Sequence, residues 1–483
     1  MSLSSAISNA VSGLSAVSRG TELVSANIAN ALTPGYARRE LDLSSHPSQG
    51  GINVQGVSRA ISAGLLADNR LAMADLGSSE TMAAFHAAME QAFGTGTETY
   101  SLGTSLTDLE AALTGAAARP DSEIQLSAVL NAATALAGKI NEISDQIQAE
   151  RNKADQAIEQ DVLRLNAGLE QVAKLNAQIV TLSAQGGDAS SLIDLRQAAI
   201  DDISDILPVS EVPRENGRVA LFTPDGAILL DGTEPARIGF SPTPGITAGS
   251  TLANGGLSTL TFNGKPLTAA QQSMLDGGSL GAHFAIRDQI APGYQQQIDA
   301  FAHELYRRLS DPAVDPSLGA GMPGLFTDAQ GAFDPADETG FAGRITVNSL
   351  VDPDAGGNLW RIRAGLDASG PGNAGESALL SRLGDALSAM QSPASASLSA
   401  APRSLQTLTS ELSSFAATNR LRAEAEALKS SAHQSGIQAA LLAQGVDTDR
   451  EMENLLALER AYAANARVFQ AANDMLDSIL GLT

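Results

Sequence analysis

Hydrophobic residues recur at alternating intervals of four and three positions through the N-terminal part of the chain. They are Leu3, Ile7, Ala10, Leu14, Val17, Thr21, Val24, Ile28 and Ala31. This spacing is typical of a helix face that packs against another helix. The opposite face carries mainly Ser, Asn and Gly, which are modest helix formers, so the helix needs a partner to be stable in water. Pro34 and Gly35 then end the helix.

A second series with the same alternation lies at the other end of the chain. Its members are Met452, Leu455, Glu459, Tyr462, Ala466, Phe469, Asn473, Leu476 and Leu480. Chain ends usually carry weak patterning, whereas here both ends are regular. Two matched stripes favour helices that pair with each other or with neighbouring subunits over helices that each cover their own domain. Polar members of a stripe, such as Glu459, would fix the register of the pair.

A long helical pattern occupies part of the chain between these ends. It runs from Asp121 to about Ser183. Its apolar positions recur every three or four residues, except for one interval of eleven residues between Ile147 and Ile158. The step predicts a local relaxation of a left-handed supercoil. At about 1.5 Å per residue, an unbroken helix here would span on the order of 90 Å.

Two stretches interrupt the helices with features of β structure. Residues 208–281 contain short apolar runs separated by Asn-Gly and Asp-Gly turns, and residues 311–375 contain candidate strands at Gly343–Leu350 and Asn358–Ala364. Gly50–Arg59 predicts a further strand or extended connector. The expected fold class is mainly α with a β-rich insertion, a multidomain α+β architecture. It would combine a terminal coiled coil, a bundle of long helices and an outer β module.

Three domains follow from these patterns, each assembled from separate parts of the chain. A terminal axial domain would combine residues 1–59 and 446–483. A long-helix domain would combine residues 60–207, 282–310 and 376–445. A β-rich outer domain would combine residues 208–281 and 311–375.

Composition removes several classes of function. The chain has 483 residues, of which 43% are hydrophobic, which is ample for buried cores. Its net charge of -24 would repel nucleic acid and anionic lipid, so neither is expected as a partner. No Cys is present, which excludes thiol chemistry. The N-terminus lacks a cleaved secretory signal and no run has the length of a membrane span, so a secreted chain would need another export route.

Motifs that suggest chemistry lack the context that the chemistry requires. Gly277–Gly281 fits the pattern G-x-S-x-G around Ser279, but no hydrophobic strand precedes it. Matches to G-x-G-x-x-G at residues 319–324 and 370–375 have no βαβ context, and the five His are scattered without ligand spacing. We therefore predict no catalytic, cofactor-binding or metal-binding residue.

Two charged clusters receive a structural interpretation. Asp201, Asp202 and Asp205 are interpreted as a solvated helix end rather than as an acid/base pair. Arg38 and Arg39 are interpreted as ordinary surface residues, with pairing to an adjacent subunit's carboxylates as the alternative.

Both ends of the chain resemble a known family. "SANIANALTPGYARRE" is similar to the N-terminal signature of the bacterial flagellar rod, hook and hook-associated proteins, and "GVDTDREMENLLALERAYAANARVFQAANDMLDSIL" resembles their C-terminal signature. The segment "GGSLGAHFAIRDQIAPGYQQQIDAFAHELYRRL" is similar to the member that joins the hook to the filament. The alternatives are another rod or hook axial protein, or a secreted hydrolase that uses Ser279.

The resemblance implies a structural protein of the extracellular flagellum and not an enzyme. It implies export through the flagellar type III apparatus without a cleaved signal peptide. The implied partners are other copies in a ring or helical oligomer, the hook protein, the second junction protein and a dedicated export chaperone at the C-terminal end. The expected assembly interface consists of Leu3, Ile7, Leu14, Val17, Val24, Ile28, Pro34, Gly35, Tyr36, Met452, Leu455, Tyr462, Phe469, Leu476 and Leu480.

Overall fold

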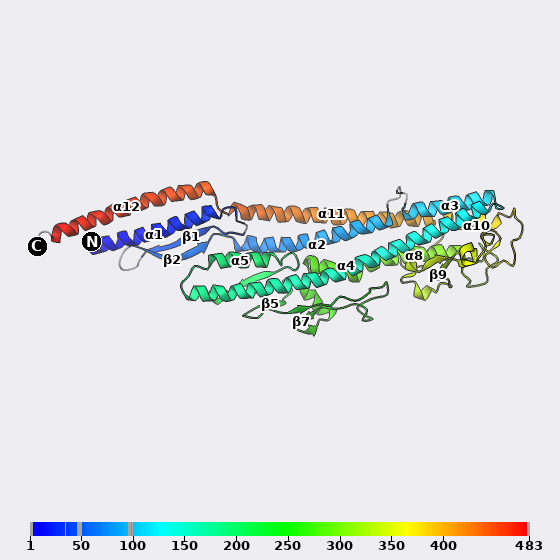
Figure 1. The fold of residues 1–483 in the computed structure, drawn as a ribbon, viewed down its shortest axis with the longest axis horizontal. Coiled ribbons are helices and arrows are strands. Elements are labelled where there is room, and N and C mark those ends of the chain that lie inside the picture. The colour runs from blue at the N-terminus through cyan, green and yellow to red at the C-terminus, as the bar shows by residue number, and fades with distance from the viewer. Residues whose placement is uncertain (1–2, 34, 46–50, 95–97, 99, 481–483) are drawn as a thin grey trace.

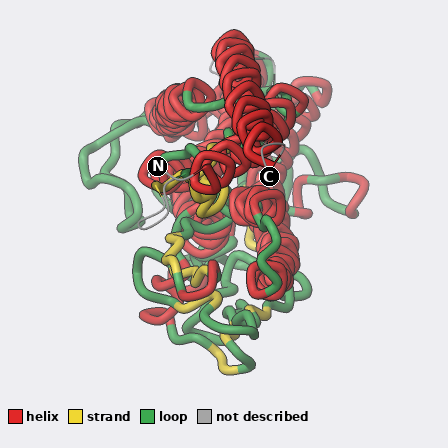
Figure 2. The backbone as a smooth tube through the Cα atoms, turned by 90° about the vertical axis from the view of Figure 1, so that its left-hand side faces the viewer, coloured by secondary structure: helices red, strands yellow, loops and turns green. Residues whose placement is uncertain are grey.

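The chain forms an elongated rod whose two ends lie together at one tip (Figure 1). The computed structural model describes residues 3–33, 35–45, 51–94, 98 and 100–480. The view along the rod shows helices gathered on one side and most strands and loops on the other (Figure 2). The fold is mainly helical with small sheets, which confirms the predicted fold class.

Twelve α-helices lie in the described part of the chain. They are α1 (Leu3–Ala29), α2 (Ala63–Phe93), α3 (Leu102–Ala118), α4 (Glu123–Ala184), α5 (Ser190–Asp201), α6 (Ala269–Gln272), α7 (Gly278–Ala285), α8 (Ala291–Leu309), α9 (Arg361–Ala364), α10 (Ala378–Ser388), α11 (Leu405–Ala443) and α12 (Thr448–Leu480). A π-helical turn, Ile286–Ile290, joins α7 to α8.

Four small antiparallel sheets accompany the helices. Their strands are β1 (Arg39–Ser45), β2 (Ile52–Arg59), β3 (Ser210–Pro213), β4 (Val219–Phe222), β5 (Ile228–Leu230), β6 (Ile238–Gly239), β7 (Thr261–Phe262), β8 (Lys265–Pro266), β9 (Phe326–Asp328) and β10 (Ile345–Val347). The sheets are β1-β2, β3-β4-β5, β6-β7-β8 and β9-β10. Strand β2 confirms the extended segment predicted at Gly50–Arg59, whereas its partner β1 was not predicted.

Serine N-caps start the long helices of the body. Ser62, Ser101, Ser122 and Ser404 each accept a hydrogen bond from the backbone N–H three residues later, which satisfies one of the free donors at a helix start. Helix α4 is 62 residues long, which confirms the predicted long helix. Helices α2 and α11 lie side by side along the rod (Figure 1).

The interruption predicted in the seam of α4 is wrong. Arg151 and Ala154 are buried and fill the step, so the buried positions Ile147, Arg151, Ala154 and Ile158 keep the alternation of four and three. The supercoil therefore has no reason to relax here. Arg151 is charged, so a pattern of apolar residues alone does not include it. It is nevertheless only 1% exposed and continues the buried face of α4.

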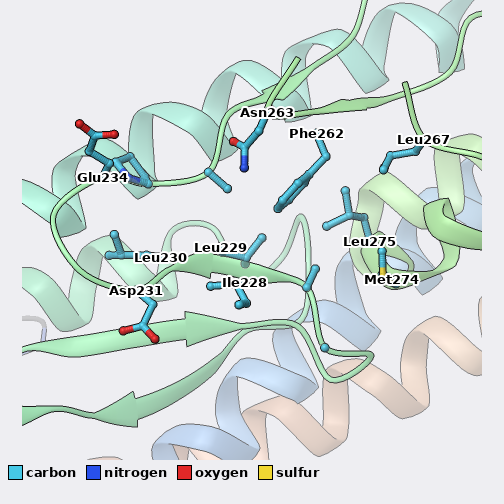
Figure 3. A pocket seen from close by; sticks show the side chains of 14 residues that line it. Ile228, Leu229, Leu230, Asp231, Glu234, Phe262, Asn263, Leu267, Met274 and Leu275 are labelled. Atoms are coloured by element: carbon cyan, nitrogen blue, oxygen red, sulfur yellow. The ribbon is translucent and has the colours of Figure 1, made fainter. Parts of the chain in front are cut away.

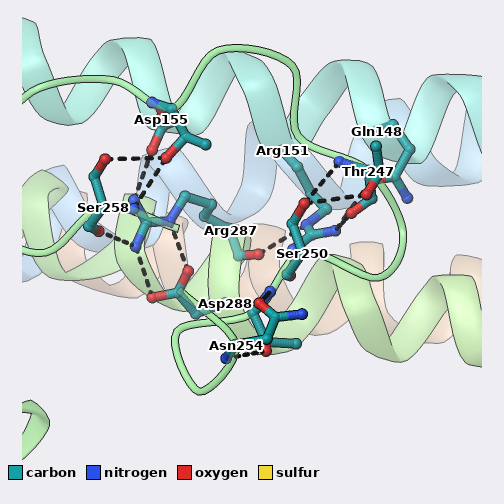
Figure 4. Close-up of polar contacts among 11 residues, drawn as sticks. Gln148, Arg151, Asp155, Thr247, Ser250, Asn254, Ser258, Arg287 and Asp288 are labelled. Atoms are coloured by element: carbon teal, nitrogen blue, oxygen red, sulfur yellow. Dashed lines mark hydrogen bonds and ion pairs between the residues drawn. The ribbon is translucent and has the colours of Figure 1, made fainter. Parts of the chain in front are cut away.

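Buried ionic contacts surround this point of α4 (Figure 4). Arg151 donates to the carbonyls of Thr247 and Ser250, both at 2.8 Å. Arg287, which is fully buried, pairs with Asp155 at 2.6 Å and with Asp288 at 2.6 Å. Two separate hydrophobic cores lie on either side of these contacts, one along the first half of α4 and one along the second. Buried charges that are fully paired satisfy one another, but each becomes costly if its partner is removed.

The two β-rich segments contribute to different cores. Strands β4, β5 and β6 pack with α5, α7 and the second half of α4. Strands β9 and β10 pack with α8 and the first half of α4. The domain boundaries expected from the sequence remain a proposal.

Two strand predictions in residues 311–375 need correction. The strand expected at Gly343–Leu350 is confined to Ile345–Val347. The strand expected at Asn358–Ala364 is wrong, because Arg361–Ala364 forms the helical turn α9. Arg363 in this turn is buried and donates hydrogen bonds to the carbonyls of Pro120 and Pro371. These contacts hold the segment as a helical turn and not as a strand.

The acidic cluster near the end of α5 is more than a solvated helix end. Asp201 pairs with Arg70 at 2.8 Å, and Arg70 is only 2% exposed. Glu211 of β3 binds the same guanidinium at 2.6 Å. Burial raises the pKa of Asp201. Asp205 pairs with Arg164 at the surface, at 3.2 Å.

A buried carboxylate in the first core gives this fold a pH dependence. Asp299 of α8 is 2% exposed and accepts hydrogen bonds from the backbone N–H groups of Gly340 and Ala342 and from the Gln295 amide. Burial outweighs these hydrogen bonds and raises the pKa of Asp299 from 3.8 to about 6.

We expect Asp299 to weaken the fold as pH rises through this interval. A pKa that is higher in the folded state means that folding favours the protonated carboxyl, so the stabilisation is complete below pH 3.8 and is lost as pH rises through about 6. Urea unfolding of the wild type and Asp299→Asn from pH 4 to 6.5 tests this. The free energy of unfolding of the wild type should fall relative to the variant by about 2–3 kcal/mol. A difference that does not change with pH would contradict the assignment.

Candidate assembly interface

The terminal helices α1 and α12 form an antiparallel pair in one heptad register. Gly13 faces Asn465, Gly20 faces Leu458, and Asn27 donates a 3.3 Å hydrogen bond to Glu451. Each step of seven residues along α1 is matched by a step of seven back along α12. The pairing partner of each terminal helix, which the sequence left open, is therefore the other terminal helix (Figure 1).

Glycine allows the two helices to approach closely. A Cβ atom on Gly13 would lie 2.8 Å from Nδ2 of Asn465, and one on Gly20 would lie 3.1 Å from the side chain of Leu458. Both distances are too short for ordinary carbon contacts, so larger side chains at these positions would separate the helices. Sequence reasoning missed Gly13 and Gly20 because they have no side chain to count as apolar. The signal that identifies them is their spacing of seven from each other and from Asn27.

Helix α1 places its predicted stripe in protected positions. Val17 and Val24 are buried, and Leu3, Ile7, Leu14 and Ile28 are half-buried. The small column of Gly13, Gly20 and Asn27 runs alongside this stripe and faces α12.

Helix α12 turns a different face toward α1 than the sequence pattern indicated. Leu455, Phe469 and Leu476 are half-buried, but Met452 and Tyr462 are 49% and 52% exposed. The predicted polar seam positions Glu459 and Asn473 are also exposed. The contact column instead includes Glu451, Leu458 and Asn465. The side chain of Leu480 lies outside the described part of the structure.

A polar cluster closes the end of the helix pair where α1 gives way to β1. The side-chain carbonyl of Asn27 accepts from Tyr36 Oη at 2.9 Å and from the backbone N–H of Arg39 at 3.0 Å, while its amide donates to the carbonyl of Arg39 at 3.0 Å. Glu451, 1% exposed, accepts from Arg38 Nε at 2.8 Å as well as from Asn27. We call Asn27, Tyr36, Arg38 and Glu451 the terminal cluster. Burial raises the pKa of Tyr36.

The turn that leads into this cluster depends on glycine. Gly35 has a φ of 76°, which disfavours residues with a Cβ, and it is exposed. Pro34, predicted as part of the interface, lies outside the described residues.

Arg39 connects the helix pair to the body of the rod. Arg39 and Arg59 both pair with Asp194 of α5, at 3.2 and 2.7 Å. The interpretation of Arg38 and Arg39 as ordinary surface residues is therefore wrong, because both bind carboxylates of the same chain in partly buried positions. Asp194 gave no signal in the sequence, since its partners are more than a hundred residues away.

An apolar groove of about 410 Å³ opens between α1, α12 and the β1-β2 hairpin. Leu23, Leu41, Leu43 and Ile52 contribute to its lining, and Leu43 and Ile52 are 52% and 42% exposed. The terminal region thus presents apolar surface that the isolated chain does not cover.

The contacts of Ser279 do not form a catalytic relay. Ser279 Oγ donates to Asp161 Oδ2 at 2.8 Å, and His283 Nδ1 lies 3.1 Å from the same oxygen. A serine nucleophile needs the imidazole between the hydroxyl and the carboxylate, whereas here the carboxylate lies between them. Ser279 also lies in the first turn of α7 and follows no strand.

A larger pocket of about 580 Å³ lies between the sheets β3-β4-β5 and β6-β7-β8 (Figure 3). Its lining is mainly apolar, with Asp231 and Glu234 at one side. Asp231 is already paired with Arg214 at 2.9 Å. In the described residues, no group of three or more potential ligands could hold a metal ion, and no helix is long and apolar enough to cross a membrane.

Three family models match this chain, one in each of its main regions. The flagella basal body rod protein model matches residues 7–36, the flagellar hook-associated protein FlgK helical domain matches residues 86–311, and the C-terminal model of the flagellar basal body rod FlgEFG proteins matches residues 437–482. The two terminal matches coincide with the paired helices, and the middle match includes α4. The chain thus belongs to the class of bacterial flagellar axial proteins.

Similar proteins define its place within that class. Flagellar hook-associated protein 1 of Escherichia coli is 24% identical over 555 aligned residues, which cover 99% of this chain and all of the relative. The Salmonella typhimurium protein of that name is 24% identical over 297 residues, covering 59% of this chain and 52% of the relative. The chain belongs to the flagellar hook-associated protein 1 family. The flagellar hook junction protein FlgK from Burkholderia pseudomallei matches with a TM-score of 0.45 and 20% identity, over 54% of this chain and 46% of that one.

The terminal cluster makes a specific prediction for Glu451. In Glu451→Ala the Arg38 guanidinium and the Asn27 amide lose a buried partner, which should weaken the helix pair by about 3 kcal/mol. Amide hydrogen exchange along α1 should then be about 100-fold faster. Glu453→Ala, at an exposed position on the same turn of α12, is the control and should leave exchange unchanged. Equal protection in both variants would show that the cluster does not hold the pair together.

Proposed function

We propose that this chain is a structural subunit of the bacterial flagellum that joins the hook to the filament. The observation that carries the proposal is the terminal helix pair. One face of α12 packs against α1 in a single register, and another face leaves Met452 and Tyr462 exposed. Half-exposed large apolar side chains on a long helix suit contact with neighbouring subunits in an array. The names of the similar proteins, hook-associated protein 1, agree with this role.

The subunit would act by assembly and not by catalysis. Contacts between different faces of identical subunits generate a ring or a helix, depending on closure. The predicted interface residues would then divide into two groups. Val17 and Val24 would hold α1 within its own subunit, and Met452 and Tyr462 would face an adjacent one.

The finer parts of the proposal come from the family resemblance. The chain would contact other copies of itself, the hook protein below and the second junction protein above, and a dedicated chaperone would bind its C-terminal end before export. It would reach the outside of the cell through the flagellar type III apparatus without cleavage of a signal peptide. The helix pair fits such a route, because a polar α1 that is stable only beside α12 can unfold at little cost.

Replacing Gly20 tests whether assembly requires the close helix pair. Gly20→Leu should leave cells with hooks that lack filaments, because the new side chain collides with Leu458. Leucine is a better helix former than glycine by roughly 1 kcal/mol, so the loss could not come from helix propensity. Adding Leu458→Ala should restore part of the filaments by making room. Electron microscopy of the cells counts hooks with and without filaments.

The control for this experiment is Gly138→Leu. Gly138 is exposed on α4, and a Cβ there would meet no atom within 4 Å, so filaments should form normally. Normal filaments in Gly20→Leu cells would contradict the proposal, as would a failure of Gly138→Leu equal to that of Gly20→Leu.

Replacing Ser279 separates this function from the alternative of a hydrolase. Ser279→Ala should leave filaments attached, and the purified wild type and variant should hydrolyse p-nitrophenyl butyrate at the same background rate, because in the described part of the chain the Ser279 hydroxyl bonds to the Asp161 carboxylate and to no imidazole. An activity that the variant loses while filaments remain would support the hydrolase instead.

A further inference from the structure

Helix α11 carries apolar residues on two opposite faces. One face, which includes Ala427, Ile437 and Leu441, is half-buried and packs along α2. The other face is exposed and consists of Leu421, Ala425, Leu428, Ala432, Ser435, Ala439 and Leu442. We call these seven residues the outer stripe. A helix that is apolar on two faces is suited to two partners, and the isolated chain supplies one.

The outer stripe has the spacing of a helix-packing seam. Its members alternate at intervals of four and three residues, and no charged residue interrupts them. Leu421, Leu428 and Leu442 are 57%, 73% and 74% exposed, although large apolar side chains are usually buried. From Leu421 to Leu442 the stripe is about 32 Å long.

The composition of the stripe determines the shape of a suitable partner. Leu421, Leu428, Ser435 and Leu442 form one column spaced by sevens, which we call the leucine column, and Ala425, Ala432 and Ala439 form the neighbouring alanine column. Large residues beside small ones form ridges and grooves into which the side chains of a second helix can pack closely. A flat or strongly charged surface could not fill these grooves.

Charges beside the stripe indicate the orientation of that helix. Arg422 and Lys429 flank the alanine column along one edge, and Glu424 flanks the leucine column along the other. Within the chain, Lys429 pairs with Glu426 and Glu424 pairs with Arg420. A neighbouring molecule in the same orientation would bring its acidic edge against this basic edge, which is favourable in a coiled-coil contact. Subunits of one array share their orientation, so a second copy of this chain meets the requirement.

The stripe also continues into the face that the proposed function assigns to subunit contacts. It ends at Leu442, and α12 begins at Thr448 with Met452 and Leu456 about half exposed. Helices α11 and α12 follow one another along the same edge of the rod (Figure 1).

From these observations we propose that the outer stripe of α11 is a docking surface for a helix of a second copy of this chain. The contact between subunits would then extend from the terminal helices into the body of the rod. This inference rests on the proposed function, because it needs an array in which copies lie side by side. Its distinct content is the place of the contact, its residues and the identity of the partner.

Photo-crosslinking in assembled flagella identifies what covers the stripe. A photoreactive benzoyl-phenylalanine at position 428 should give covalent dimers of this chain on irradiation, identified by mass spectrometry. The same group at Glu426, exposed on the same helix but outside the stripe, is the matched control. Dimers should be at least about tenfold more abundant from position 428, as expected for a residue within the contact. Equal yields, or a cross-link from position 428 to a hook-type subunit, would overturn the proposal.

Charge substitutions test whether the stripe is needed for assembly. The double variant Leu421→Asp with Leu428→Asp should lower the number of hooks with filaments at least about tenfold, because two carboxylates would be buried in the contact. The control is Ile124→Asp with Leu163→Asp, which changes two residues of α4 that are 80% and 64% exposed. Both purified variants should melt like the wild type, since exposed substitutions shift stability little.

Comparison with Gly20→Leu distinguishes failure of the stripe proposal from failure of the proposed function. If the stripe variant assembles normally while Gly20→Leu does not, the stripe is not a contact and the proposed function stands. If both variants carry normal filaments, the proposed function fails as well. Loss of filaments in the α4 control equal to that in the stripe variant would also overturn the stripe proposal, because the effect would then come from added charge alone.

Discussion

The structure depends on the close approach of the first and last helices of the chain. Glycine at positions 13 and 20 lets α1 lie against Asn465 and Leu458, and the contact between Asn27 and Glu451 closes the same register. The pair brings the two ends of the chain together at one tip of the rod, where Asp194 holds them to α5 through Arg39 and Arg59.

The body of the rod extends this arrangement without needing a catalytic centre. Helix α4 runs through two hydrophobic cores, and the buried pairs of Arg287 with Asp155 and Asp288 mark the boundary between them. Paired charges at such a boundary restrict which segments can pack there, because each unpaired alternative leaves a charge buried. Long helices that run through both cores suit a subunit whose role is to hold its neighbours at fixed positions.

The sequence predicted the elements whose signal is local. The regular stripe of α1, the presence of the helix α12, the length of α4 and the turn at Gly35 follow from spacing, propensity and glycine geometry, and these agree with the structure. It failed where distant residues determine the outcome. Arg363 holds α9 as a helical turn through the carbonyl of Pro120, and Arg151 occupies a core position that apolar counting skips. The face of α12 that meets α1 is set by glycines on the partner helix, which a hydrophobicity pattern cannot register.

A cysteine pair tests the register of the terminal helices most directly, because the chain has no Cys of its own. Gly13→Cys with Asn465→Cys should form a disulfide within one molecule on mild oxidation, visible as a shift on a non-reducing gel at low protein concentration. Gly13→Cys with Leu458→Cys, displaced by one heptad, should remain reduced. Equal oxidation of both pairs, or disulfides only between molecules, would contradict the antiparallel pairing on which the account rests.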